Sequence, residues 1–148
     1  MSTFSALTGD SAVLLRPVVA LNVWTLVMEG WMYATRLPAM SKYNVDTNPS
    51  KIKKDMETKL PPSIAWVADN YNHLMEQPTQ YYAVVLTLAL LGANDKTNVR
   101  LAWTYVGIRM VHSLVQSTIN KVMLRFGLFS SSSAVLAVLT ARTAALLF

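Results

Sequence analysis

The chain contains 148 residues, of which 53% are hydrophobic and only 14% are charged, and its mean hydropathy is +0.32. This length suffices for one domain, and the composition argues against a soluble helical bundle, whose amphipathic helices carry a charged outer stripe. The net charge of +5 does not indicate nucleic-acid binding, because the basic residues form no patch interleaved with aromatic ones. Since the sequence has no cysteine, it excludes disulfides, thiolate nucleophiles and cysteine-ligated metals, and we expect no bound metal.

Four long apolar blocks separated by polar segments predict an all-α integral membrane protein, a four-helix bundle formed by a single domain. We expect its helices over about residues 14–36, 63–92, 98–120 and 122–147. The first helix should end near Arg36, because Pro38 follows. We expect no cleavable signal peptide, since Asp10 precedes the first block and no small-residue cleavage site is evident.

The segment between the first two blocks, residues 37–62, is a polar loop that contains five lysines. The positive-inside rule places such a loop in the cytoplasm. Four spans bring the first and third connections to the same side of the membrane. Arg125, in the first turns of the last helix, should therefore lie on the same side as Arg36.

The second apolar block carries a stripe of polar residues in its first half. They recur at helical spacing, as Asp69, Asn72 or His73, Glu76 and Gln80. Pro78 predicts a kink of the helix beside this stripe. Taken alone, His73 is more typical of a hydrogen-bonded interface histidine than of a metal ligand.

A second polar stripe lies on the third block, where residues recur at the three- and four-residue steps of one helix face: Arg109, His112 or Ser113, Gln116 and Asn120. Such groups are costly in a bilayer, so we expect them to face the bundle interior, a partner or a water-filled cavity. Arg36, Arg109 and Arg125 would then meet in one leaflet. Three guanidinium groups favour an anionic ligand, because they pair with carboxylates bidentately. Near the opposite end, we expect Arg142 to snorkel towards the membrane surface.

Over nearly its whole length the chain resembles the MAPEG family, the membrane-associated proteins of eicosanoid and glutathione metabolism. The resemblance rests on the four-helix pattern, the basic first loop and three motifs, namely Tyr33-Ala-Thr-Arg36-Leu-Pro38, Glu76-Gln-Pro78, and Arg109-Met-Val-His112 followed by Arg125. It implies a homotrimer that binds glutathione between subunits near the cytoplasmic side, in contact with membrane lipid and with a small lipophilic substrate. The sequence is more similar to bacterial members than to the animal enzymes, which suggests the inner membrane of a bacterium.

The resemblance also implies roles for individual residues. Arg125 matches the arginine that stabilises the glutathione thiolate, since a nearby cation lowers the pKa of a thiol. Arg36 would contact glutathione, and Glu76 would order the pocket and meet the amino group of the ligand. Arg109 and His112 match the Arg-x-x-His motif of the third helix. The binding residues expected in total are Arg36, Asn72, His73, Glu76, Arg109, His112 and Gln116.

The sequence departs from active glutathione-using members at several of these positions. Asn72 and His73 replace an Arg-Asn pair ahead of the glutamate, and Gln116 replaces a tyrosine. The proline follows the glutamate by two residues rather than four, and Phe126 stands next to Arg125 where some members have a hydroxyl residue.

Three functions are consistent with these residues. The first is a glutathione-dependent transferase or peroxidase that acts on lipophilic electrophiles, and the second is a non-catalytic membrane scaffold or lipid-binding trimer. The third is a small exporter of lipophilic cations that couples transport to Glu29, although three arginines on the pathway would repel a cation. Whether the protein is an enzyme stays open at this point, and we favour the first function.

Overall fold

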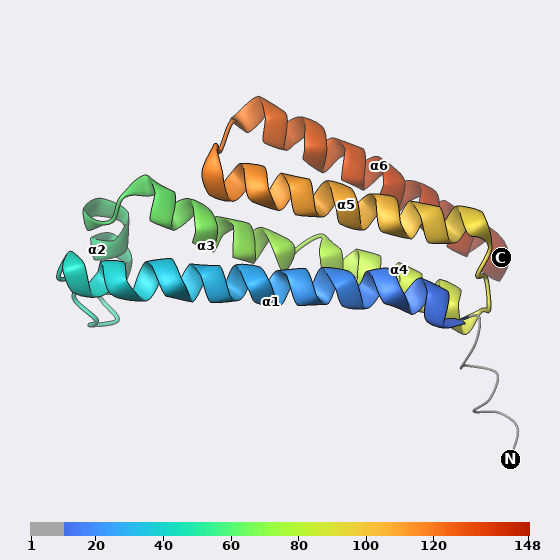
Figure 1. Ribbon diagram of the computed structural model, residues 1–148, viewed down its shortest axis with the longest axis horizontal. Helices are drawn as coiled ribbons and strands as arrows, with labels where there is room; N and C mark the ends of the chain where they lie inside the picture. The colour runs from blue at the N-terminus through green and yellow to red at the C-terminus, as the bar shows by residue number, and fades with distance from the viewer. Residues whose placement is uncertain (1–10) are drawn as a thin grey trace, which may run out of the picture.

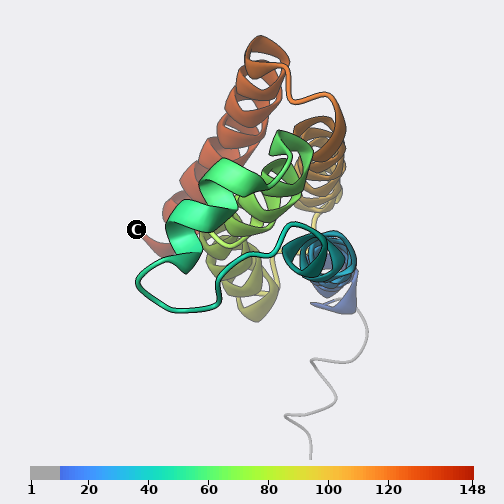
Figure 2. The ribbon, with the colours of Figure 1, turned by 90° about the vertical axis from the view of Figure 1, so that its left-hand side faces the viewer.

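The computed structural model describes residues 11–148, in which every regular element is an α-helix (Figure 1). Asp10, on which the signal-peptide expectation depends, lies outside these residues. The helices lie side by side along the long axis of the molecule, apart from α2, which lies at one end (Figure 1, Figure 2). In chain order they are α1 (Ser11–Lys42), α2 (Ile52–Lys59), α3 (Pro62–Leu74), α4 (Pro78–Leu90), α5 (Lys96–Thr118) and α6 (Val122–Leu147).

Helix α1 is longer than we expected, because it continues past Arg36 and Pro38 to Lys42. A proline inside a helix removes one backbone hydrogen bond, here to the carbonyl of Ala34, and that residue lies on the exposed side of the helix. The helix ends where Asn44 adopts a left-handed φ of 49°, a conformation that commonly terminates helices.

The polar connection after α1 is ordered by local pairs. Asp55 pairs with Lys59 at 2.5 Å and accepts the backbone N–H of Asp46 at 2.9 Å. The ammonium group of Lys59 and this N–H hold the pKa of Asp55 below its usual value. On the side that faces α1, the Sδ atom of Met56 accepts from Nη2 of Arg36 at 2.9 Å, which anchors α2 to the end of α1.

The second expected helix, over residues 63–92, is divided into α3 and α4. Pro78 has no N–H to donate to the carbonyl of Leu74, so the ladder of helical hydrogen bonds ends there and a turn over residues 75–77 separates the two helices. The interruption falls beside Pro78, where the sequence predicted a kink, and it is a break rather than a bend within one helix.

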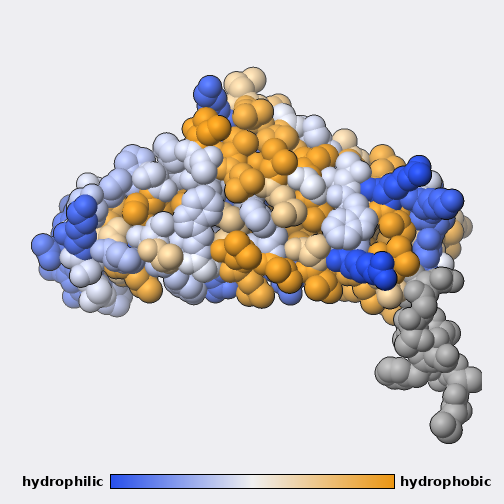
Figure 3. Space-filling model, viewed as in Figure 1, coloured by the Kyte–Doolittle hydropathy of each residue, from blue (hydrophilic) through white to orange (hydrophobic). Residues whose placement is uncertain are grey.

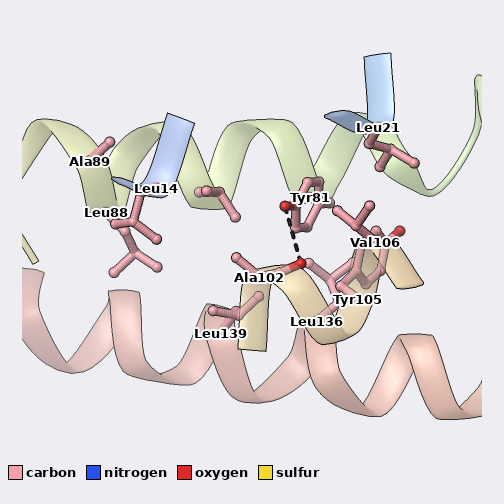
Figure 4. Packing of buried hydrophobic residues seen from close by; sticks show 11 residues of the cluster. Leu14, Leu21, Tyr81, Leu88, Ala89, Ala102, Tyr105, Val106, Leu136 and Leu139 are labelled. Atoms are coloured by element: carbon pink, nitrogen blue, oxygen red, sulfur yellow. Dashed lines mark hydrogen bonds between the residues drawn. The ribbon is translucent and has the colours of Figure 1, made fainter. Parts of the chain in front are cut away.

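A buried cluster of apolar side chains joins α1, α4, α5 and α6 (Figure 4). The rings of Tyr81 and Tyr105 stack with their centroids 4.3 Å apart, and Tyr81 donates its hydroxyl hydrogen to the carbonyl of Ala102 at 3.3 Å. That bond satisfies a hydroxyl group that would be costly to bury alone. The aliphatic members of the cluster are Leu14, Leu21, Val85, Leu88, Ala89, Ala102, Val106, Leu136 and Leu139.

The outer surface of the chain is largely apolar along its middle. Figure 3 shows hydrophobic residues over much of the middle of one face, while most of the strongly hydrophilic residues lie towards its two ends. Val19, Leu26 and Leu90 are exposed by 58%, 58% and 78%, which a water-facing helix would avoid. Within the described residues, two helices are long and apolar enough to cross a membrane by length and composition, Ala12–Lys42 in α1 and Val122–Leu147, which is α6.

Helices α5 and α6 are joined by an ion pair at the end of the molecule away from α2. Asp95 precedes α5 and accepts the backbone N–H groups of Thr97 and Asn98 at 3.0 and 3.2 Å, as an N-cap does. Arg142 of α6 donates to both carboxylate oxygens of Asp95 at 3.1 and 3.2 Å, and to Oδ1 of Asn98 at 2.5 Å. Arg142, for which we expected snorkelling, therefore has partners within the protein. Desolvation raises the pKa of Asp95, but the two backbone amides and Arg142 together hold it below its usual value.

Replacing Asp95 by alanine removes both the cap of α5 and the partner of Arg142. We expect the Asp95→Ala variant to lose about 1 kcal/mol of unfolding free energy, the usual cost of a missing N-cap. Because the pKa of Asp95 is lower in the folded than in the unfolded chain, its contribution is present at neutral pH and is lost as the pH falls through the folded-state value. Thermal unfolding in detergent at neutral and acidic pH measures both effects. The variant Lys96→Ala changes an exposed neighbour, and an equal loss in that control would contradict the assignment.

Candidate functional site

Arg109 lies on the inward side of α5 and is 0% exposed. Its Nη2 atom donates at 2.8 Å to the backbone carbonyl of His73, which is left free because α3 ends one residue later. Among the described residues, Nε and Nη1 of Arg109 have no hydrogen-bond partner, and no carboxylate lies within ion-pair distance of its guanidinium group. A buried cation without a counter-charge is costly, so these free donors mark a position where an anion would be stabilised.

Two histidines, a glutamate and a phenylalanine gather beside this arginine. The Nδ1 atom of His73 lies 2.9 Å from Oε2 of Glu76. The ring of His73 stacks on that of His112, with centroids 5.5 Å apart and planes inclined by 24°, and its centroid lies 5.4 Å from that of Phe129 on α6. His112 is 2% exposed, whereas the side chains of His73 and Glu76 are 28% and 64% exposed. The cluster is therefore accessible from the side of His73 and Glu76.

Arg125 enters the same region from the first turn of α6. Its Nη1 atom donates to Oδ1 of Asn120 at 2.6 Å, and its buried Nε atom has no partner among the described residues. Asn120 takes a left-handed φ of 52° in the turn between α5 and α6, so this bond ties the arginine to the turn. Arg125 lies one helical turn before Phe129, whose ring centroid is 5.4 Å from that of His73. The cluster thus unites several expected site residues, His73, Glu76, Arg109, His112 and Arg125.

Arg36 and Asn72 lie in a separate place. They line a cleft of about 200 Å³ between α1, α2 and α3, together with Lys53, Glu57 and Asp69. Asn72 and its neighbour His73 belong to different groups because successive side chains of a helix point in directions about 100° apart. Within one chain, the structure does not join this cleft to the arginine–histidine cluster.

The polar stripe expected on the second helix faces outward. Four of its members are exposed, namely Asp69, Asn72, Glu76 and Gln80. The inward side carries Asn70 instead, which is 0% exposed and donates from Nδ2 to Oγ of Ser113 at 2.8 Å. Sequence reasoning missed Asn70, although its position three residues before His73 places it on the same helix face as that histidine.

Further unpaired polar atoms lie near this bond. Gln116 is 2% exposed and Ser117 is 5% exposed on the next turn of α5. Oε1 of Gln116, Oγ of Ser117 and Oδ1 of Asn70 have no hydrogen-bond partner among the described residues. Buried polar groups are normally satisfied, so unpaired acceptors here and unpaired donors on Arg109 indicate a place for ordered water or a ligand.

Gln77 connects the turn between α3 and α4 to the neighbouring helices. Its Nε2 atom donates to Oγ of Ser133 at 2.7 Å, and its Oε1 atom accepts from the hydroxyls of Tyr105 and Ser132, each at 3.4 Å. Sequence reasoning gave no role to Gln77 or to Phe129. A glutamine between two helices could have been noticed, whereas a phenylalanine in an apolar helix carries no distinguishing signal.

The fold and the site together define an all-helical protein with two apolar helices of membrane-spanning length and a cluster of arginines and histidines between its helices. The described residues contain no group of three or more His, Cys, Asp and Glu side chains that could hold a metal ion. The model of one family, described as the MAPEG family, matches residues 14–145. The chain therefore belongs to the MAPEG family and is a membrane protein of that group, which confirms the resemblance found in the sequence. No curated protein and no solved structure matches the chain in the corresponding comparisons.

The bond between Asn70 and Ser113 is a buried polar contact that joins α3 to α5. Removing one partner leaves the other unpaired, so we expect Asn70→Ala to reduce the unfolding free energy by about 1–3 kcal/mol. The double variant Asn70→Ala/Ser113→Ala should lose less than the sum of the single variants, with a coupling energy of about 1 kcal/mol. Thermal unfolding of the four proteins measures this cycle. A cycle of Asn70→Ala with Ser131→Ala, which removes an exposed hydroxyl on α6, is the additive control; additivity in both cycles would contradict the bond.

Proposed function

We propose that the protein binds glutathione and stabilises its thiolate for attack on lipophilic electrophiles, as a glutathione-dependent transferase or peroxidase. The observation that carries this function is the buried guanidinium of Arg109, which is 0% exposed and has two nitrogen atoms without partners among the described residues. Taking such a charge out of water is expensive, and only a well-placed counter-charge offsets that cost. A carboxylate of glutathione supplies the counter-charge and accepts charge-assisted hydrogen bonds from the free N–H groups.

Arg125 is the residue that we propose for stabilising the thiolate. Its position is fixed by the 2.6 Å bond from Nη1 to Asn120, while its Nε atom has no partner among the described residues. A fixed cation beside the sulfur increases the thiolate fraction at neutral pH. An electrophile dissolved in the membrane then reaches the sulfur from the apolar surface of the helices, and proximity and electrostatic stabilisation provide the catalysis.

The proposed topology has four spans, formed by α1, by α3 with α4, by α5 and by α6. Helix α5 contains 23 residues and is about 34 Å long, which matches a hydrocarbon core of about 30 Å. The lysines between α1 and α3 favour the cytoplasm for that end of the molecule. The similarity to bacterial members favours a bacterial inner membrane.

The proposed assembly is a homotrimer with glutathione between subunits. In one chain the cleft that contains Arg36 and Asn72 is separate from the cluster around Arg109. A ligand at a subunit boundary can contact the cleft of one chain and the cluster of the next, which accounts for this separation. The exposed apolar side chains along α1 and α6 supply surface for contacts with lipid and with the other subunits.

A second candidate function is a non-catalytic membrane scaffold or lipid-binding trimer. It is favoured by the partners that two arginines already have, since Arg109 donates to the carbonyl of His73 and Arg125 donates to Asn120. In this function, Arg109 caps the end of α3, Arg125 holds the turn before α6, and neither guanidinium group binds a ligand. Glutathione binding separates the two functions.

Titration of the detergent-purified protein with glutathione in a calorimeter tests the first function. We expect the wild type to bind and the variants Arg109→Ala and Arg125→Ala each to bind at least about tenfold more weakly, because a hydrogen bond to a charged group contributes about 1.5–3 kcal/mol. The control Arg100→Ala removes an exposed arginine from the other end of α5 and should leave the affinity unchanged. Unchanged affinity in both site variants would exclude the proposed pocket.

Chemical crosslinking in detergent tests the assembly. We expect lysine-reactive reagents to give species of one, two and three subunits and no larger ones, because a closed trimer has no further free interface. A sample that is dissociated in denaturing detergent before crosslinking is the control and should stay monomeric. A ladder that stops at two subunits would count against the trimer.

A further inference from the structure

His73 and Glu76 form a carboxylate–imidazole pair at the break between α3 and α4. Nδ1 of His73 lies 2.9 Å from Oε2 of Glu76, so a neutral ring donates its Nδ1 hydrogen to the carboxylate. The other ring nitrogen, Nε2, then keeps its lone pair and is able to accept a proton. A carboxylate that selects the tautomer in this way makes the imidazole suitable as a general base.

The surroundings hold the backbone and the ring of His73 in place. The backbone carbonyl of His73 accepts from Nη2 of Arg109 at 2.8 Å. Its ring lies 5.5 Å from that of His112 on α5 and 5.4 Å from that of Phe129 on α6, measured between centroids. Contacts from two other helices therefore fix the base, as a preorganised site requires.

The second imidazole of the cluster, His112, lacks these features. Among the described residues, no carboxylate lies within ion-pair distance of its ring. It is also 2% exposed, whereas the side chain of His73 is 28% exposed and can be reached by a ligand. Of the two histidines, His73 is the one with both an orienting carboxylate and access.

A thiolate site that contained only arginines would have no acceptor for the thiol proton. A guanidinium group stabilises the thiolate but stays protonated and accepts no hydrogen bond. The charged and titratable groups near His73 are Glu76 beside it, Arg109 and His112 on α5, and Arg125 on α6. Glu76 is already engaged with Nδ1 of His73, so the available acceptor is Nε2 of that histidine.

Resting on the glutathione site proposed above, we infer that His73 accepts the thiol proton of bound glutathione and that Glu76 is its positioning residue. In this step the S–H bond breaks, its electron pair stays on sulfur, and the proton is transferred to Nε2. The products are a thiolate, stabilised by Arg125, and an imidazolium, stabilised by Glu76. The proton stays within the site and is not released to solvent.

Two measurements on the full-length protein in detergent, at neutral pH and with saturating glutathione, test this step. The ultraviolet absorbance of the thiolate, with S-methylglutathione as the reference ligand, gives the thiolate fraction per bound glutathione. Calorimetry in buffers of different ionisation enthalpy gives the number of protons released per bound glutathione. The variants are His73→Gln, which removes the base, and Glu76→Gln, which keeps the size and hydrogen bonding of an exposed side chain but removes its charge. Arg100→Gln is the matched control at an exposed position on α5.

For the wild type we expect a thiolate signal with far less than one proton released per thiolate. In His73→Gln the ratio of thiolate to thiol should fall at least about tenfold, the change that one pKa unit produces. Glu76→Gln should give a smaller decrease and Arg100→Gln none. One proton released per thiolate in the wild type, or an unchanged thiolate fraction in His73→Gln, would overturn the role of His73 while leaving glutathione binding intact. Failure of the wild type to bind glutathione would instead overturn the proposed function, and the role of His73 with it.

Discussion

The hydrogen bond from Arg109 to the backbone carbonyl of His73 is the contact on which the arrangement of the site depends. Pro78 ends the helical ladder and leaves carbonyl groups without donors at the end of α3. Such carbonyl groups are costly to bury without a donor, and a buried guanidinium is equally costly without an acceptor. The arginine and the helix break therefore stabilise one another across α3 and α5, at a donor–acceptor distance of 2.8 Å.

This contact also determines which side chains meet. Because α5 packs against the last turn of α3, the ring of His112 stacks on that of His73. The turn that follows places Gln77 among hydroxyl groups of α5 and α6, so that a third helix is joined to the same point. One interruption in one helix thus sets the relative positions of the histidines, the glutamate and the arginines that carry the proposed chemistry.

Helical periodicity correctly predicted which side of α5 is polar and faces inward, because a charged group on an apolar helix is costly to expose to lipid. Arg109, His112 and Gln116 are all buried, as the cost of exposing them to lipid requires. The same periodicity identified a polar face on the second helix but could not give its direction. That face points outward in the single chain, since a stripe in one sequence does not state whether the partner is the same chain, another copy or solvent.

The features that were missed have specific physical reasons. The break between α3 and α4 follows from Pro78, yet whether a proline bends or ends a helix depends on the partners that its neighbours find, here Arg109 and Gln77. Pro38 shows the opposite outcome, because α1 continues through it on an exposed side. The sequence did not indicate Phe129 as a site residue, because its contribution is the position of its ring next to those of His73 and His112. Family membership, by contrast, was visible in short motifs and is confirmed over residues 14–145.

Asn72 and His73 stand where the resemblance to active glutathione-using members implies an Arg-Asn pair, and this difference changes the kind of charge that the second helix supplies. A guanidinium has a fixed positive charge and accepts no proton, whereas a neutral imidazole has a nitrogen that can accept one. Asn72 lines the cleft with Arg36, and only His73 reaches the cluster around Arg109. The substitution therefore does not simply weaken an anion site. It replaces one permanent cation by an imidazole where two other arginines already provide the positive charge. Such a combination suits the ligand that we propose, which must lose a proton after it binds.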